Sequence, residues 1–446
     1  GNMKKNLKSL VASMLAFTLV LSACNTSKPK TKEVEKTTTG KLKGEITVQA
    51  EKGWMDYYKK VVDKITKANP DSKIKLKEIA SFDHLGVIQK TDATNKDVAD
   101  VFALPADKFT ELADNNVLGA LPAAEMAKEL GGFDDFDKGL GGQFKKDKDY
   151  LAFPYNIESL VTFVNKKNAE TLKIDHTKPF EITAQKDAAT VLLPFFDAWF
   201  GVAPNNAGGL DLLAKKDKKF TSTYANPYDK LTADQKAVFD GVYGYWKLNK
   251  DAGTPLFDAE AGWGYIDKEF TTGGKGVIRL DGPWSTAGKG VIAKEIKAGN
   301  IEVYPINHIT VAGKAFTHWK GGWALGINAR IEADKNKVAL ATAFIKELVN
   351  PANAVDIYKS TGKILGNVKA DVYKASDLSE IDKKVITNVI ESYKVSPARP
   401  LFKEFGQVWD TWKNSVLSWN SVKPADAASA YKELNAAFTS MLEQLK

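Results

Sequence analysis

The sequence predicts an α/β protein of two lobes, each with a mostly parallel sheet flanked by helices. Its 446 residues are too many for one hydrophobic core but suit two large lobes. Between residues 44 and 104, strand and helix patterns alternate, which favours a parallel sheet with right-handed crossovers. With 43% hydrophobic and 26% charged residues, the composition is that of an ordinary globular protein.

The predicted elements follow from apolar periodicity and from the residues that interrupt it. Strands are expected where apolar residues alternate or form short runs, at 44–50, 73–80, 100–104, 160–165, 277–280, 301–305 and 323–328. Helices are expected where apolar residues share one helical face, at 55–68, 84–94, 109–115, 188–200, 234–250, 337–348, 381–393 and 427–445. No internal repeat of fixed period is present.

The N-terminus has the pattern of an export signal. Lysines precede a short apolar run, Leu10–Leu21, which is too short to span a membrane and leads to Leu-Ser-Ala-Cys24. This ending resembles a bacterial lipobox, which implies a signal peptide at 1–23 and a lipid on Cys24. Residues 24–41 then form a polar, flexible tether, and Gly1-Asn2, before Met3, are interpreted as cloning remnants. Because Cys24 is the only cysteine, no disulfide and no cysteine-based metal site are expected.

Charge and motifs exclude several function classes. The net charge of +8 is spread among acidic residues without interleaved aromatics, so no nucleic-acid partner is expected. None of the four histidines is spaced as a metal ligand, and the sequence contains no H-E-x-x-H or G-x-S-x-G motif. We therefore expect no cofactor, no metal and no catalytic residue. A glycosidase needs only two carboxylates that face each other, and such a pair has no characteristic sequence motif, so a glycosidase remains an alternative.

The stretch Lys275–Trp284 is the first candidate for a binding site. A buried strand ends at Asp281-Gly282-Pro283, and the fixed φ of proline forces a turn that presents Trp284 just beyond the strand. Strand ends in open α/β sheets are common ligand sites. Trp284 is thus either a stacking platform or a cap on the core of its own lobe.

Other aromatic and acidic residues also lie beside turns. Aromatic rings stack on the C–H faces of sugars and carboxylates accept hydrogen bonds from vicinal hydroxyls, so their combination indicates carbohydrate binding. For each acid taken singly, a solvated loop charge is the alternative. Trp199 and Trp246, inside predicted helices, are expected in the core. The turn residues are Glu51, Asp107, Glu158, Trp54 and Trp263. Trp409 and Trp412 are three residues apart, a spacing typical of the core, and the alternative is that one of them faces a cleft.

Together these stretches resemble the extracellular sugar-binding proteins of ABC importers, specifically the maltose/maltodextrin type. The resemblance covers nearly the whole chain from Leu42 onward. It implies sugar contacts through the acid-lysine pair Glu51-Lys52, the pair Asp107-Lys108, Glu158 in a crossover segment, and the stacking residues Trp284 and Trp409.

The sequence departs from the family prototype at several of these places. Leu104 stands where the prototype has tryptophan, Lys108 replaces an arginine, and Thr190 and Leu193 replace polar and aromatic groups of a binding helix. Lysine offers a point charge instead of a planar fork, so a bidentate contact at 108 is weakened. Replacement stacking is expected from Trp54, Tyr155 or Trp263.

The resemblance implies a two-lobe periplasmic-binding-protein fold of type II with its ligand cleft between the lobes. The first lobe is expected at 42–156 plus 325–375, and the second at 157–324 plus 376–446. The implied function is capture of maltose or malto-oligosaccharides and delivery to ABC permease subunits by hinge closure. A monomer, anchored by the Cys24 lipid on the extracellular face of the cytoplasmic membrane, and no enzymatic activity are expected. The alternatives are another oligosaccharide, an exported glycan-degrading enzyme, or a surface adhesin.

Overall fold

The computed structural model describes residues 41–446, which fall into two compact units. The predicted signal peptide, Cys24 and nearly all of the tether lie outside the described residues. Of the described residues, the first unit comprises residues 41–103, Asn115–Phe153 and Leu325–Asn350. The second unit comprises Leu104–Asp114, Pro154–Ala324 and Pro351–Lys446.

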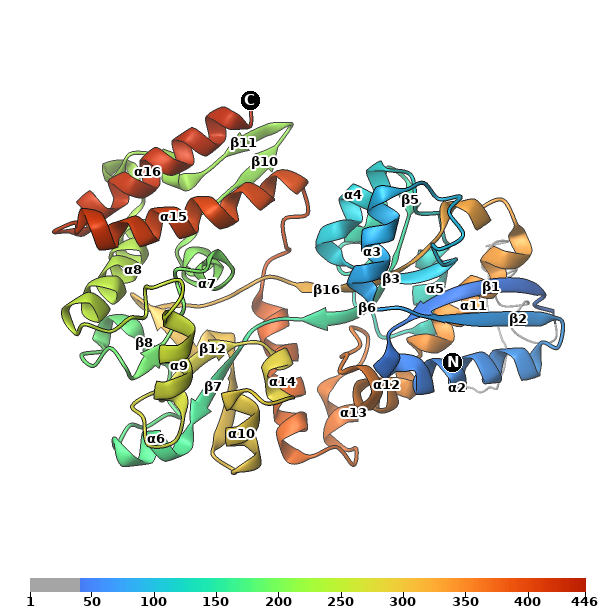
Figure 1. Ribbon diagram of the computed structural model, residues 1–446, viewed down its shortest axis with the longest axis horizontal. Helices are drawn as coiled ribbons and strands as arrows, with labels where there is room; N and C mark the ends of the chain where they lie inside the picture. The colour runs from blue at the N-terminus through green and yellow to red at the C-terminus, as the bar shows by residue number, and fades with distance from the viewer. Residues whose placement is uncertain (1–40) are drawn as a thin grey trace. The chain divides into compact units, whose positions relative to one another are not determined.

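The first unit is built on a five-stranded sheet with the strand order β2-β1-β3-β16-β6, in which β1 pairs in parallel with β2 and β3. Helix α2 packs on β2 (Figure 1). Of its predicted apolar face, Tyr58, Val61 and Ile65 are buried and Val62 is half-buried. The elements are β1 (Gly44–Ala50), α2 (Met55–Ala68), β2 (Ser72–Glu78), α3 (Ser81–Lys90), β3 (Val101–Pro105), α5 (Ala123–Leu130), β4 (Lys145–Lys146), β5 (Asp149–Tyr150), β6 (Phe153–Glu158), β16 (Gly321–Ile327) and α11 (Lys335–Leu348). Of these, the last two residues of β3, Pro154–Glu158 of β6 and Gly321–Ala324 of β16 belong to the second unit.

The second unit has a four-stranded sheet with the order β13-β7-β12-β9. Its strands are β7 (Val161–Asn165), β9 (Val191–Leu192), β12 (Ile278–Asp281) and β13 (Ile301–Pro305). The sheet is mixed and not mostly parallel as predicted, because β7 runs antiparallel to both β12 and β13. Those two neighbours run in the same direction, joined by a crossover through α10 (Val291–Lys297). The α/β fold class itself is confirmed.

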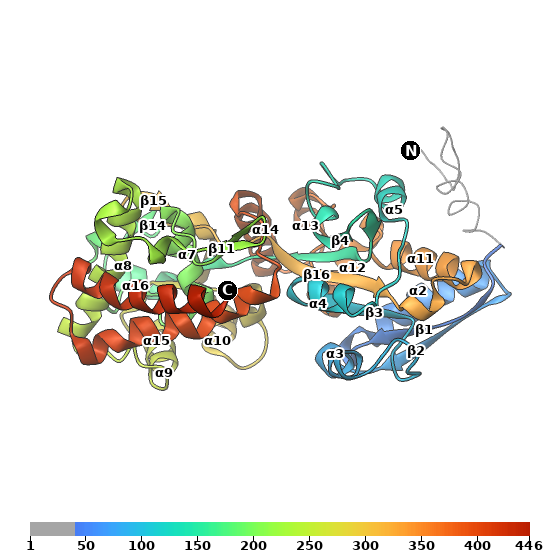
Figure 2. The ribbon, with the colours of Figure 1, turned by 90° about the horizontal axis from the view of Figure 1, so that it is seen from above.

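Helices make up most of the remaining second unit. Figures 1 and 2 both show α15 and α16 side by side, and Trp412 and Trp419 of α15 are fully buried there. Trp246 on α8 is also buried, as predicted. The elements are α4 (Phe109–Asp114), α6 (Lys166–Thr171), β8 (Phe180–Glu181), α7 (Ala198–Gly208), β10 (Ala214–Lys216), β11 (Lys219–Thr221), α8 (Ala233–Asp251), α9 (Gly262–Phe270), β14 (Ile309–Val311), β15 (Lys314–Ala315), α12 (Ala354–Thr361), α13 (Ala370–Lys374), α14 (Glu380–Val395), α15 (Gln407–Val422) and α16 (Ala427–Gln444).

The helix predicted at 188–200 is wrong. Residues 191–192 form the short strand β9, and α7 begins only at Ala198. Pro194 cannot donate a helical hydrogen bond, whereas Asp197 caps the real start by accepting one from the backbone N–H of Trp199 at 2.9 Å. The apolar run was therefore a buried strand followed by a new helix, and Trp199 lies in the first turn of α7.

The two units divide the chain differently from the predicted lobes. Ala324/Leu325 is a boundary in both divisions, but residues 351–375 and 104–114 belong to the second unit. The predicted boundaries, as hinge positions of a closing protein, stay a prediction. No helix within residues 41–446 is long and apolar enough to cross a membrane.

Candidate functional site

The turn at the end of β12 presents Trp284 to solvent. Strand β12 is buried throughout, and Pro283 opens a 3₁₀ turn over Pro283–Thr286. The carboxylate of Asp281 accepts a hydrogen bond from the Gly282 N–H at 2.8 Å and lies 3.4 Å from Arg279 Nη2. Burial raises the pKa of Asp281 above its ordinary value, and the charge of Arg279 and the hydrogen bond from Gly282 oppose this shift without reversing it. This buried network fixes the turn, and Trp284 beyond it is 51% exposed.

Trp284 belongs to a group of aromatic side chains that we call the tryptophan cluster, all in the second unit. Trp199 is its centre, with ring centroids 6.4 Å from Trp284, 5.8 Å from Trp319 and 6.5 Å from Trp409. The exposed fraction falls from Trp284 through the half-buried Trp199 and Trp409 to the buried Trp319. The cluster also contains Phe405 and His318. A partly open wall of indoles is therefore present, which suits stacking on apolar ring faces.

The benzo ring of Trp284 folds back on Gly282, and a Cβ at position 282 would overlap it. We expect Gly282→Ala to displace the indole and to weaken ligand binding on the order of 10-fold. The fold should be retained, because a φ of −109° at this position is accessible to alanine. Affinity is measured by calorimetric titration with maltotriose, a member of the ligand class that the sequence resemblance implies. Gly290→Ala is the control, since a Cβ at position 290 meets nothing within 4 Å. Equal affinity of both variants would show that the ring position does not matter.

Charged groups lie against the tryptophan cluster. The guanidinium carbon of Arg399 lies 5.3 Å from the ring centroids of both Trp199 and Trp319. Arg399 Nη2 lies 3.4 Å from a carboxylate oxygen of Asp107. Burial lowers the pKa of Arg399, and the negative charges of Asp107 and Glu158 oppose that shift. Polar donors and acceptors thus border the indole wall.

Among the predicted site residues, the structure brings together Asp107, Trp284 and Trp409, with Trp199 and Arg399 linking them. Glu158 acts on Arg399 through its negative charge. Lys108, next to Asp107, is half-buried. Sequence reasoning missed Trp199, His318 and Arg399. The helix-capping residue Asp197 could have indicated the helix start beside Trp199, whereas no sequence pattern marks Arg399 or His318.

The predicted residues of the first unit lie in the segment after β1. Glu51 accepts a hydrogen bond from the Ser81 N–H at 3.1 Å and so helps to cap α3. Lys52 is exposed, and Trp54 is buried and stacks on Tyr58 with ring centroids 5.9 Å apart. Their predicted role in sugar binding stays a prediction.

Two further predicted residues lie outside the tryptophan cluster. Tyr155 is buried, and the Lys363 ammonium lies 5.0 Å from its ring centroid and 4.7 Å from that of Trp323. Trp263, on α9, is half-buried and packs edge-on against Phe196 and Phe200. For both residues, replacement stacking stays a prediction.

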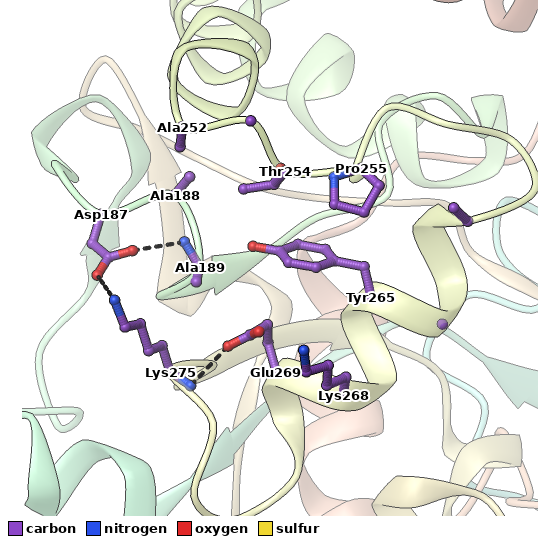
Figure 3. Close-up of a pocket in the computed structure, with 13 residues that line it drawn as sticks. Asp187, Ala188, Ala189, Ala252, Thr254, Pro255, Tyr265, Lys268, Glu269 and Lys275 are labelled. Atoms are coloured by element: carbon purple, nitrogen blue, oxygen red, sulfur yellow. Dashed lines mark hydrogen bonds and ion pairs between the residues drawn. The ribbon is translucent and has the colours of Figure 1, made fainter.

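The second unit also has a hollow of about 580 Å³ beside α9, shown in Figure 3. Asp187 and Lys275 form an ion pair at 3.6 Å on its wall, and burial together with Glu269 raises the pKa of Tyr265 to about 12. None of the ten predicted sugar-binding residues lines it. Within residues 41–446, no group of three or more metal-ligating side chains is present.

Comparisons with known proteins give matches in structure only. No family model and no curated protein matches the sequence. The maltose-binding periplasmic protein MalE from Listeria monocytogenes, in complex with maltose, has a TM-score of 0.66 and 23% identity, covering 89% of this chain and 98% of that one. MalX from Streptococcus pneumoniae, in complex with maltopentaose, has a TM-score of 0.62 and 20% identity, covering 89% and 99%. An extracellular solute-binding protein from Staphylococcus aureus, in complex with maltose, has a TM-score of 0.63 and 19% identity, covering 90% and 97%.

The chain has the two-lobe fold of maltose- and maltodextrin-binding proteins. The predicted resemblance to this type of protein is thereby confirmed at the level of fold. These solved structures are of binding proteins and not of enzymes.

Proposed function

We propose that this protein captures maltose or malto-oligosaccharides outside the cell and delivers them to the permease of an ABC importer. The observation that carries the proposal is the tryptophan cluster, an open indole wall bordered by Arg399, Asp107 and Glu158. Indoles stack on the apolar faces of glucosyl rings, and the charged groups exchange hydrogen bonds with ring hydroxyls. The complexes of similar fold with maltose and maltopentaose support the same sugar class.

The function is tested by titrating the protein with maltose, maltotriose and maltopentaose, and with cello- and xylo-oligosaccharides as comparison sugars. Nine of the ten tryptophans, all but Trp54, lie in the second unit, so their fluorescence should report binding at the tryptophan cluster. Saturable changes with the maltose series support the proposal, and silence with every sugar overturns it. Saturation only with a comparison sugar would retain sugar capture but change the substrate.

Enzymatic activity is separated from binding by following the same mixtures over hours. A binding protein returns the sugar unchanged, so the concentration of reducing ends stays constant. New reducing ends that scale with protein concentration would instead favour the exported glycan-degrading enzyme.

We also propose that a lipid on Cys24 anchors the protein on the extracellular face of the cytoplasmic membrane. Expressed from Met3 in a bacterium, the wild-type chain is expected in the detergent phase of a Triton X-114 partition. Cys24→Ala should move it to the aqueous phase, because the cysteine sulfur carries the lipid. Lys28→Ala, in the same predicted tether, is the matched control and should partition like the wild type. Detergent partition of Cys24→Ala would exclude this anchor.

A further inference from the structure

Arginine is rare in this chain. Only three of its 63 basic residues are arginines, namely Arg279, Arg330 and Arg399, and the other 60 (63 − 3) are lysines. Each arginine lies beside an aspartate. Arginine differs from lysine in offering a rigid, planar fork of donors that matches paired acceptors. What matters at each of the three positions is therefore which hydrogen bonds the planar guanidinium can make that a lysine ammonium could not.

For two of these arginines the use is structural. Arg330 donates to Asp100 from Nε at 3.1 Å and from Nη2 at 2.9 Å, and its Nη1 donates to the carbonyl of Asn95 at 2.8 Å. Arg279 is buried and donates from Nη1 to Asp267 at 2.7 Å. Both guanidinium groups hold neighbouring segments together inside their own unit.

Arg399 has the same fork but most of its donors are unused. Its only polar contact within residues 41–446 is the ion pair of Nη2 with Asp107 at 3.4 Å, which is long for such a pair. The guanidinium lies over the rings of Trp199 and Trp319, and these ring faces offer its N–H groups no carbonyl or carboxylate acceptor. In the described chain, a few buried side-chain nitrogen and oxygen atoms lack a hydrogen-bond partner, and no atom of Arg399 is one of them. The Arg399 N–H groups that make no hydrogen bond are therefore accessible to solvent.

We propose that Arg399 is a specificity-determining residue, whose free N–H groups donate to hydroxyl oxygens of a neutral glucosyl ring. This inference rests on the proposed function. Asp107, at the other end of the ion pair, would accept from a neighbouring hydroxyl of the same ring. Arg399 thus supplies from the C-terminal segment the planar donor that Lys108 cannot. A neutral sugar fits because Asp107 and Glu158 already balance the positive charge.

The proposal is tested with Arg399→Met, which removes the donors, and Arg399→Lys, which keeps the charge but not the fork. Calorimetric titration with maltotriose is expected to show a loss of affinity on the order of 10- to 100-fold for Arg399→Met. Arg399→Lys should bind more weakly than the wild type and more tightly than Arg399→Met. Lys403→Met removes an exposed charge four residues away and should bind like the wild type.

A series of mono-deoxy maltoses separates hydrogen bonding from mere support of the indoles. The analogue that lacks the contacted hydroxyl should bind wild type and Arg399→Met equally, while the other analogues still distinguish them. If Arg399→Met bound every analogue more weakly than the wild type by the same factor, the proposal would be overturned. It would also be overturned if Arg399→Met bound maltotriose with wild-type affinity. A third contrary outcome is wild type that binds a glucuronate-containing disaccharide more tightly than maltose. Wild type that binds no sugar would overturn the proposed function as well, whereas normal binding by Arg399→Met overturns this inference alone.

Discussion

Replacing Trp284 with alanine is expected to weaken maltodextrin binding on the order of 100-fold or more while the second unit stays folded. Trp284 is the most exposed member of the tryptophan cluster. Leu104, Thr190 and Leu193 stand where the family prototype has aromatic or polar groups, but they are not aromatic and are buried, so they provide no stacking surface. The remaining stacking surface comes from Trp199 and Trp409, which are half-buried. Losing the outermost indole removes most of the apolar area that a sugar ring can cover.

Stability should change little, because Trp284 is 51% exposed. Within residues 41–446, its ring packs against one other aromatic ring, that of Trp199, and folds back on Gly282. Calorimetric titration with maltotriose measures the affinity, and urea unfolding measures the stability. Val422→Ala is the control, because Val422 is also 51% exposed and lies at the end of α15. Normal sugar binding by Trp284→Ala would return Trp284 to the role of a core cap.

The position of Trp284 could be predicted because its causes are local. The apolar run before it makes a buried strand, and Asp281-Gly282-Pro283 can only turn. The same holds for α2, whose buried face of Tyr58, Val61 and Ile65 follows helical steps of three and four residues. Where neighbouring residues decide the conformation, the sequence pattern was enough.

Trp199 shows where local patterns were not enough. Placing it inside a helix over 188–200, near the C-terminal end, led to its assignment to the core, whereas the actual start of α7 at Ala198 puts it in the first turn. An apolar run that contains a short buried strand and a helix start cannot be divided by periodicity alone. The wrong helix boundary therefore hid the central residue of the tryptophan cluster.

Arg399 and His318 could not be predicted for a different reason. They meet Trp199 only through tertiary packing, from segments that carry no periodic pattern of their own. The antiparallel course of β7 was equally hidden, because the strand pattern is the same in either direction. Pairings between distant segments depend on the whole fold, and a single sequence does not contain them in readable form.

The second unit is expected to lose about 2 kcal/mol of stability between pH 7 and pH 5 through His318 alone. The imidazole is buried, its Nε2 lies 2.6 Å from the carbonyl oxygen of Trp199, and its ring centroid lies 4.3 Å from that of Trp199. Burial lowers the pKa of His318 to about 3; the hydrogen bond to Trp199 acts against this, and the charge of Arg399 adds to it.

The sign follows from the two protonation equilibria. The histidine of the unfolded chain titrates near its ordinary pKa of 6.5 and that of the folded protein near 3, so between these values the unfolded state binds more protons. The contribution of His318 is therefore fully favourable above pH 6.5 and is lost progressively as the pH falls toward 3. His318→Gln keeps a hydrogen-bond donor for the Trp199 carbonyl but cannot titrate.

Urea unfolding at pH 7 and pH 5, followed by tryptophan fluorescence, compares the wild type with His318→Gln. Burial lowers the pKa of His84 to about 4 as well, with the charge of Lys77 adding to the effect, but His84 lies in the first unit and is present in both proteins. Since all tryptophans but Trp54 lie in the second unit, the signal follows the part of the chain that contains His318. An equal loss of stability in both proteins would mean that His318 is accessible to protons in the folded state. His308, whose pKa is also lowered by burial, lies in the second unit of both proteins and contributes equally to both. A larger loss in the wild type than in His318→Gln would show that the tryptophan cluster is held around a histidine that must stay neutral.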